Sequence, residues 1–190
     1  MRGSRALRSA FALVTILALP GAASSQSRPG SDAANAVAAR ARAALAPLAP
    51  LVGQWEGEAR EFHAPGQSTL YRQHEDVVFG AGQTVLIVRG TGRAAEGANK
   101  GAIGFEAAAT IWFDADSSRI RMRAHRAEGI AISPELELKP DTLIWGFPVR
   151  GGRIRYILAY SSTDWHEVGQ FVREGTAPFT FMDMRLKRKP

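Results

Sequence analysis

The chain has 190 residues, an ordinary length for one domain, and 45% of them are hydrophobic, which is enough for a buried core. It contains no cysteine, which excludes disulfides, thiolate metal sites and a cysteine nucleophile. The net charge of +6 falls to +3 once the three arginines of residues 1–25 are set aside, and so small an excess is not typical of a nucleic-acid-binding protein.

The N-terminus has the pattern of a secretory signal peptide. Arginines at positions 2, 5 and 8 precede a short apolar run at residues 10–19, and small residues follow it. The run is too short to span a bilayer, so we expect residues 1–25 to be removed during export. The sequence therefore predicts a periplasmic or extracellular protein with no membrane span.

Residues 26–47 predict a polar linker followed by a short helix. Ser31 or Asp32 can cap the helix, because a side-chain oxygen there accepts hydrogen bonds from the first free backbone amides. The alanine-rich stretch that follows favours helix, and Pro47 ends it. We expect this helix to lie against the domain that begins at residue 48.

From Gly53 onward, polar and apolar residues alternate with the period of a β-strand, and the pattern recurs through the rest of the chain. A glycine- and alanine-rich stretch at residues 90–104 interrupts it and predicts a loop. About ten strands with short connections predict an antiparallel meander, and a long meander removes its exposed edges by closing into an up-and-down β-barrel. Residues 48–190 are therefore predicted to be an all-β barrel, with strands near residues 53–62, 68–79, 84–89, 105–113, 119–126, 130–138, 142–149, 153–160, 165–172 and 179–188.

The second predicted strand is polar on both faces. Arg72, His74 and Asp76 alternate on one face, and Gln73 and Glu75 lie on the other. This is not typical of an outer-membrane barrel, which has an apolar outer band. If the face with Arg72, His74 and Asp76 points inward, these side chains line a cavity and orient a polar ligand head or act in general acid–base chemistry. If that face points outward, they are ordinary surface residues.

Two segments resemble one known group of proteins. Residues 51–58, Leu-Val-Gly-Gln-Trp-Glu-Gly-Glu, resemble the Gly-x-Trp-x-Gly opening of calycin, or lipocalin-like, barrels. Residues 178–188, with their aromatic and basic side chains, resemble the last strand of nitrobindin-like proteins and of a related bacterial domain family of unknown function. The resemblance implies a calycin-like barrel over residues 48–190.

In calycin barrels the tryptophan of the first strand closes the bottom of the barrel beneath a cation from the last strand. The resemblance therefore gives Trp55, with Gly53 and Gly57, a structural role in closure. It also implies that Arg185 or Lys187 lies over the indole. A cation–π contact of this kind contributes on the order of 0.5–2 kcal/mol.

Nitrobindins hold haem through a histidine in the last strands of the barrel. Here Met182 and Met184 occupy the last predicted strand, and the nearest histidine, His166, lies in the strand before it. Methionine is an axial ligand in some electron-transfer haems, but two methionines on one strand face are typical of core packing. The sequence thus predicts no cofactor, with haem as the alternative that the resemblance implies.

These patterns favour an exported, non-catalytic protein that binds a small hydrophobic or amphipathic molecule. The alternatives are a haem barrel with peroxynitrite or peroxide chemistry and a ligand-free interaction module. No catalytic motif and no metal site is predicted, and the sequence determines neither the ligand nor the oligomeric state. The remaining candidate cavity residues are aromatic: Phe105, Phe113, Trp145, Tyr156, Tyr160 and Phe171.

Overall fold

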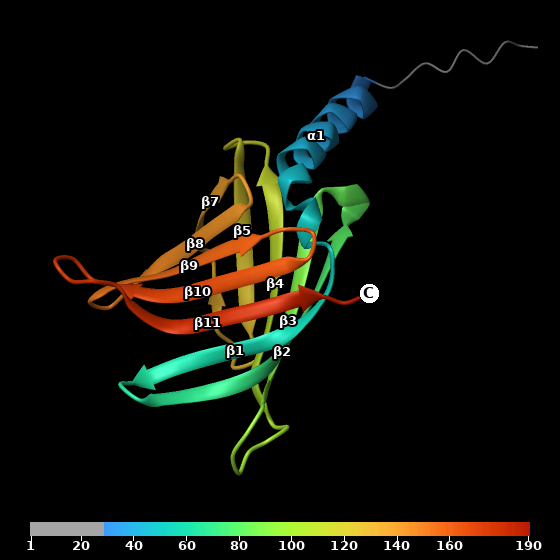
Figure 1. Cartoon of the computed structure of the whole chain (residues 1–190). Helices are drawn as coiled ribbons and strands as arrows, with labels where there is room; N and C mark the ends of the chain where they lie inside the picture. The colour runs from blue at the N-terminus through green and yellow to red at the C-terminus, as the bar shows by residue number, and fades with distance from the viewer. Residues whose placement is uncertain (1–28) are drawn as a thin grey trace, which may run out of the picture.

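The computed structural model describes residues 29–190, so the predicted signal peptide at residues 1–25 lies outside the described residues. The described chain begins with helix α1 (Pro29–Leu45), which continues into a short 3-10 helix, η1 (Ala46–Leu51). The expected N-terminal helix is confirmed, and Figure 1 shows α1 standing off one end of the strands.

Eleven strands follow, and each runs antiparallel to its neighbours in one sheet. The predicted all-β, antiparallel architecture is therefore confirmed. The strands are β1 (Gly53–Ala64), β2 (Gln67–Gly80), β3 (Val85–Ala94), β4 (Ile103–Asp114), β5 (Arg119–Arg126), β6 (Ala131–Ile132), β7 (Glu135–Lys139), β8 (Thr142–Val149), β9 (Gly152–Tyr160), β10 (Asp164–Val172) and β11 (Phe179–Arg188), with the single turn η2 (Ala81–Gln83) before β3.

The sheet has the strand order β6-β5-β4-β3-β2-β1-β11-β10-β9-β8-β7, so the first strand pairs with the last and the sheet curls into a half-barrel (Figure 1). Its two ends, β6 and β7, are consecutive in the chain but do not pair with each other. β6 is only two residues long and covers only Ala124 and His125 of β5. Most of β5 therefore faces β7 with no backbone ladder between them, and we call this line the seam.

The loop expected at residues 90–104 is shorter than predicted, because both of its ends belong to strands. β3 continues through Gly90 and Gly92 to Ala94, and β4 begins at Ile103, so the connection spans residues 95–102. Glycine usually weakens a strand, which is why the stretch was interpreted as a loop. Here the two glycines remain in the sheet because side chains of β2 lie against their backbone.

The buried core is concentrated at the end of the half-barrel that α1 and η1 cover. Trp55 is fully buried, its indole N–H donates to the carbonyl oxygen of Leu51 at 2.7 Å, and its ring lies edge-on to Trp165 at 5.7 Å. The hydroxyl of Tyr160 donates to the carbonyl oxygen of Pro47 at 3.1 Å. These bonds tie η1 to β1 and β9, so this end is closed by packed side chains.

The cation over the closing tryptophan is Arg188, where Arg185 or Lys187 was expected. The Arg188 guanidinium carbon lies 4.3 Å from the centre of the Trp55 ring. The register places Arg188 opposite Trp55, so between Met182 and Arg188 the even-numbered residues of β11 face the interior. Arg185 and Lys187 consequently lie on the outer face, where each pairs with an aspartate.

Arg188 also fastens the end of β11 to the segment before β1. Its guanidinium donates to the carbonyl oxygens of Pro50 and Val52, and to that of Ser162 in the connection before β10. The role proposed for a last-strand cation in closure is therefore filled by a residue that makes three hydrogen bonds besides its contact with the indole.

The two glycines expected at the closure are required for different reasons. Gly53 has φ +138°, a conformation that residues with a β-carbon rarely adopt. Gly57 has no room for a β-carbon, which would overlap the carbonyl oxygen of Arg185 on β11. Close approach of β1 and β11 thus depends on Gly57.

Candidate functional site

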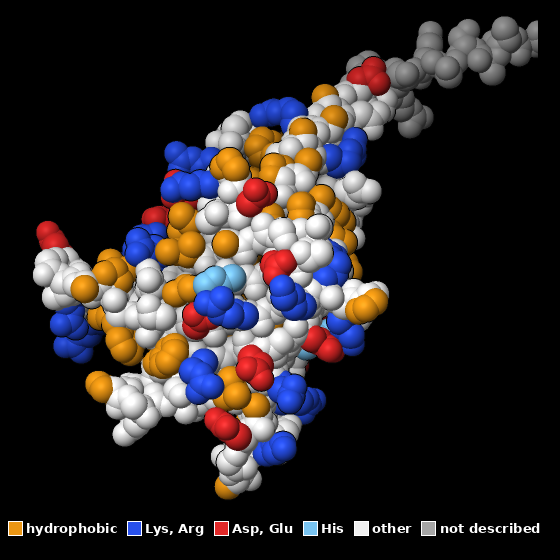
Figure 2. All heavy atoms as spheres, in the orientation of Figure 1, with side chains coloured by type: hydrophobic (Ala, Val, Ile, Leu, Met, Phe, Trp, Pro, Cys, Tyr) orange, Lys and Arg blue, Asp and Glu red, His pale blue; other side chains and the backbone are white. Residues whose placement is uncertain are grey.

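The structure settles which face of β2 points inward. Gln73 and Glu75 are buried, whereas Arg72, His74 and Asp76 lie on the outer face. Asp76 pairs there with Arg89 of β3 at 2.7 Å, and His74 lies 3.6 Å from Glu56 of β1. The three residues expected to line a cavity if they faced inward are therefore surface residues. Figure 2 shows basic and acidic side chains interspersed over the outer face of β9, β10, β11 and β1.

The six aromatic candidates all lie on the face of the sheet that carries the buried side chains, but at different levels. Trp145 and Tyr156 meet in the middle, where their rings stack at 3.9 Å with an interplanar angle of 10°. Phe181 of β11 completes this group, edge-on to Tyr156 at 5.6 Å.

The other four aromatic candidates lie toward the two ends of the half-barrel. Tyr160 is buried beneath η1, and the guanidinium of Arg40 from α1 covers Phe113 at 5.4 Å. Phe105 and Phe171 lie at the opposite end, each beneath an arginine at 5.2 and 5.5 Å. Only the central stack is thus placed to face a molecule held in the interior.

Beside this stack lies a group of buried polar side chains that we call the carboxyl cluster: Gln73 and Glu75 of β2, Trp145 of β8, and Trp165 and Glu167 of β10. Only 4% of Gln73, 6% of Glu75 and 6% of Glu167 is exposed. The Gln73 amide donates to Glu75 Oε1 at 2.7 Å. The indole N–H groups of Trp145 and Trp165 donate to Glu167 at 3.0 and 3.4 Å.

Burial dominates the titration of both acids. It raises the pKa of Glu75 to about 8, against the hydrogen bond from Gln73 and reinforced by the charge of Glu167. It raises the pKa of Glu167 to about 6, although the two indole donors lower it. At neutral pH Glu75 therefore keeps its proton while Glu167 is largely ionised.

Glycines on β3 provide the space that the carboxyl cluster occupies. A β-carbon at Gly90 would lie 2.5 Å from Glu75 Oε1, and one at Gly92 would lie 2.6 Å from Gln73 Oε1. Both separations are shorter than atoms tolerate, so any larger residue at either position displaces a polar side chain of β2.

Sequence reasoning placed Gln73 and Glu75 on one face of a strand but selected neither of them as a site residue, and it did not select Glu167. A signal was present in β3, where Gly90 and Gly92 are spaced like Gln73 and Glu75. Small residues at matching spacing on a neighbouring strand indicate the face on which large side chains lie across them.

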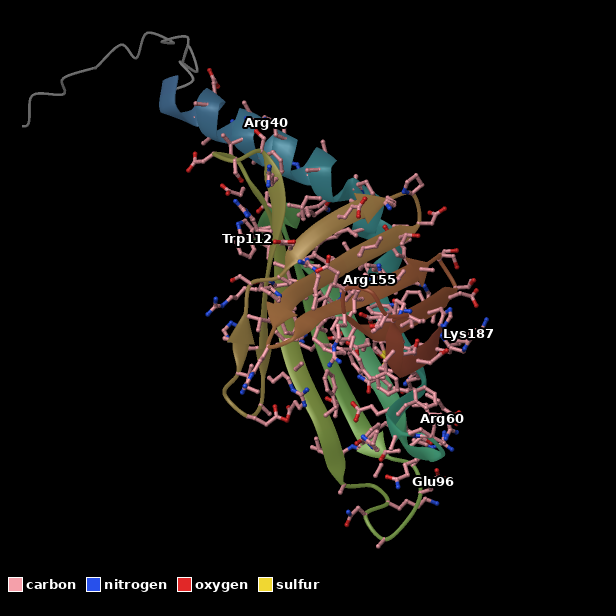
Figure 3. All side chains as sticks on the ribbon, turned by 90° about the vertical axis from the view of Figure 1, so that its left-hand side faces the viewer. Arg40, Arg60, Glu96, Trp112, Arg155 and Lys187 are labelled. Atoms are coloured by element: carbon pink, nitrogen blue, oxygen red, sulfur yellow. The ribbon has the colours of Figure 1, made fainter. Side chains whose placement is uncertain are left out.

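The seam opens into a cleft of about 650 Å³. Its deeper wall is apolar and comes from the inward faces of β5, β7 and β8, while its rim carries charged side chains and Trp112, which Figure 3 labels. We call it the seam cleft, and its lining residues are Trp112, Asp114, Arg119, Ile120, Arg121, Met122, Ser133, Pro134, Glu135, Leu136, Leu138 and Leu143.

Trp145 connects the seam cleft to the carboxyl cluster. It lies directly across from the cleft residue Leu136 in the β7–β8 ladder and donates to Glu167.

A second hollow, of about 750 Å³, lies on the outer face of β1, β2 and β3 and contains two of the predicted ligand-binding residues, Arg72 and His74. Its other lining residues include Glu56, Glu58 and Arg93, so charged side chains dominate it. Such a surface offers little apolar area to a ligand.

The side chains present do not fit a haem held by histidine. All four histidines are at least partly exposed; His74 and His166 lie on the outer face, where His166 is 3.2 Å from Asp183. Met182 and Met184 are buried in the core. Within residues 29–190, no three histidine, aspartate or glutamate side chains come together in a way that could hold a metal ion.

Two solved structures share this fold. Rv2717c from M. tuberculosis has a TM-score of 0.56 at 14% identity, over 77% of this chain and 98% of that one. The S-type phycobiliprotein lyase CPES from Guillardia theta has a TM-score of 0.54 at 11% identity, over 80% of this chain and 96% of that one. Both are calycin-like β-barrels, which confirms the fold that the resemblance implied; at these identities the likeness shows the fold alone.

Comparisons with protein-family models and with curated proteins gave no match. The specific likeness to nitrobindins therefore stays a prediction. Among the described residues, no helix combines the length and the apolar character needed to cross a membrane.

Proposed function

We propose that this protein binds a small apolar or amphipathic molecule without transforming it, and that the molecule enters through the seam cleft. The observation that carries the proposal is the cleft itself: an opening of about 650 Å³ in the wall of a calycin-like half-barrel. Its volume lies within the roughly 300–1,000 Å³ that is usual for sites of small ligands.

The lining of the cleft favours an apolar body. Ile120, Leu136 and Leu138 are only half-buried although they lie on the inward face of the sheet. Apolar area removed from water stabilises a complex by about 25 cal/mol per Å². A ligand that covers these side chains therefore gains affinity from area that the empty protein leaves exposed.

The rim of the seam cleft is polar. Arg121 pairs with Asp114 at 3.4 Å, whereas the Arg119 side chain makes no ion pair or hydrogen bond with any other described residue. The mouth of the cleft therefore offers water and an available guanidinium, in contrast to the apolar lining further in.

Calorimetric titration with three ten-carbon amphiphiles, decanol, decanoate and decylamine, tests the proposal. We expect at least one of them to bind. The variant Ile120→Trp places an indole in the seam cleft and is expected to weaken binding at least tenfold. Thr91→Trp, which places the same ring in the second hollow, is the control and should leave binding unchanged.

Two outcomes would contradict the proposal. If none of the three amphiphiles binds, the interaction-module alternative takes its place. If Thr91→Trp weakens binding and Ile120→Trp does not, the ligand lies on the outer face of β1–β3 and the seam is not the site.

Export is part of the same proposal, because residues 1–25 have the pattern of a signal peptide. We expect the full-length chain, expressed in a bacterium, to be recovered from the periplasm or the medium with its first 25 residues removed. Intact-mass measurement of the recovered protein checks this. A full-length mass in the cytoplasmic fraction would contradict it.

A further inference from the structure

The interior of the half-barrel holds two acids with no cation opposite them. Glu75 and Glu167 are both buried, and in the described part of the chain no arginine, lysine or histidine pairs with either carboxyl group. Buried carboxylates in folded proteins are normally paired with a cation or a metal. This pair has only neutral donors, namely one amide and two indoles.

The hydrogen bonds of the cluster also leave acceptors unused. Gln73 gives its amide N–H to Glu75 Oε1, but Gln73 Oε1 and Glu75 Oε2 accept no hydrogen bond from any described residue. Neither oxygen is among the side-chain atoms of the described residues that are shut off from water without a partner, so both border space that a donor can reach. A ligand that brings a donor to these two oxygens fills acceptor positions that no protein group occupies.

Other interior charges lie elsewhere. The Arg126 guanidinium covers Phe105 at 5.2 Å and is held by Glu128 at 2.9 Å. The pKa of the Tyr71 hydroxyl is raised mainly by burial and, to a smaller extent, by the nearby charge of Glu61. Neither Arg126 nor Glu61 contributes to the titration of Glu75.

We propose that the carboxyl cluster binds a protonated nitrogen on the ligand, so that the molecule held in this interior is an apolar amine. The inference rests on the proposed function, because it assigns a chemical class to the ligand that enters through the seam. The nitrogen donates to Glu75, Gln73 and Glu167, and its single positive charge takes the place of the proton that Glu75 carries in the empty protein.

The surroundings of the cluster suit a cation that carries an apolar body. Trp145, stacked on Tyr156, lies between the seam cleft and Glu167. A cation close to the face of a tryptophan or tyrosine ring gains about 0.5–2 kcal/mol. The apolar part of the amine then extends toward Leu136 and the other cleft residues.

In the empty protein a proton takes the place of the ligand's charge. Because burial holds the pKa of Glu75 near 8, the acid is protonated at neutral pH and loses its proton when an ammonium group arrives. Binding of an amine should therefore release a proton to the buffer and strengthen as the pH rises toward 8.

Titration with decylamine, decanol and decanoate, which have the same chain and differ in the head group, tests the inference. At pH 8 we expect decylamine to bind at least tenfold more tightly than decanol, and decanoate to bind most weakly. In Glu75→Gln, an isosteric change, the preference for the amine over the alcohol should fall below threefold while decanol binds as before. Glu167→Gln should reduce the preference in the same direction. Glu58→Gln, an exposed outer-face residue on the neighbouring β1, is the matched control and should keep the full preference.

The outcomes separate this inference from the proposed function. Equal affinity for the three head groups, or tightest binding of decanoate, overturns the amine assignment and leaves ligand binding at the seam intact. Absence of binding by all three overturns both. An amine preference that survives in folded Glu75→Gln and Glu167→Gln, with folding checked by circular dichroism, also overturns the assignment.

Discussion

Stability should fall as the pH rises from 5 to 8, and Glu75 should be the main cause. Its pKa is 4.5 in the unfolded chain and about 8 in the folded protein, because burial disfavours the carboxylate. The folded state therefore holds a proton that the unfolded state has lost over this range. The resulting stabilisation is complete below pH 4.5 and is lost as the pH passes through about 8.

The size of the effect follows from the same two values. Each pKa unit corresponds to about 1.4 kcal/mol, so the difference between 4.5 and about 8 corresponds to roughly 5 kcal/mol in the free energy of unfolding. Glu167, with a pKa of about 6, adds roughly 2 kcal/mol, all of it below pH 7. The sum is a large part of the roughly 5–15 kcal/mol that stabilises a typical domain.

The surface carboxylates do not mask this trend. Glu56, Asp114, Glu128 and Asp164 have pKa values lowered by hydrogen bonds to neighbouring side chains, so their contributions vary below pH 4.5. Between pH 5 and 8 they are ionised in both states. The window is therefore governed by the two buried acids.

Urea unfolding followed by circular dichroism at pH 5, 6.5 and 8 measures the effect. Wild type should lose several kcal/mol of stability across this series, whereas Glu75→Gln should lose only the smaller part that belongs to Glu167. The variant carries no titrating group at this position, so the comparison isolates one acid. Parallel pH profiles for the two proteins would refute the account of a buried, proton-holding Glu75.

Three further substitutions test how the barrel is closed, each by thermal or urea unfolding. Arg188→Met removes the cation over the indole and three hydrogen bonds, and should lower the free energy of unfolding by about 3 kcal/mol. The control, Lys187→Met on the outer face, should lower it by less than about 1 kcal/mol. Equal losses in the two variants would mean that Arg188 has no special role. Leu48→Ala removes a fully buried side chain of η1 and should cost about 2–5 kcal/mol, and a neutral result would show that η1 does not close the end. Gly57→Ala drives a methyl group into the carbonyl oxygen of Arg185 and should cost about 2–3 kcal/mol, while a stable variant would show that β1 and β11 have room to separate.

The alternation of side chains along the chain was sufficient to predict the strands but not which of two polar faces lies inside. In β2, Gln73 and Glu75 alternate with Arg72 and His74, and both sets are polar. The inward face is decided by what lies across the sheet, and the backbone of Gly90 leaves space for the Glu75 carboxyl group. The register between β2 and β3 decides which residue of β3 lies beside Glu75. The alternation of residues within β2 carries no information about that register.

The same limit explains the closing cation. The sequence predicts a basic last strand, and residues 185, 187, 188 and 189 are all basic. Which of them reaches Trp55 depends on the register between β1 and β11, where a shift of one residue exchanges the inner and outer faces. The resemblance to calycins fixed the type of contact, and only the ladder identified Arg188.

The seam also determines how the barrel responds to molecules of different shape. A closed barrel, in which every strand is hydrogen-bonded to both neighbours, increases its circumference only by breaking a row of backbone hydrogen bonds. Here β5 and β7 are joined through the two-residue β6 and a short corner at Ser133 and Pro134, so the two strands separate by bending that corner while every backbone pair remains in place. Under the proposed function, the seam would therefore admit molecules that differ in cross-section by a ring or a branch with little loss of folding stability.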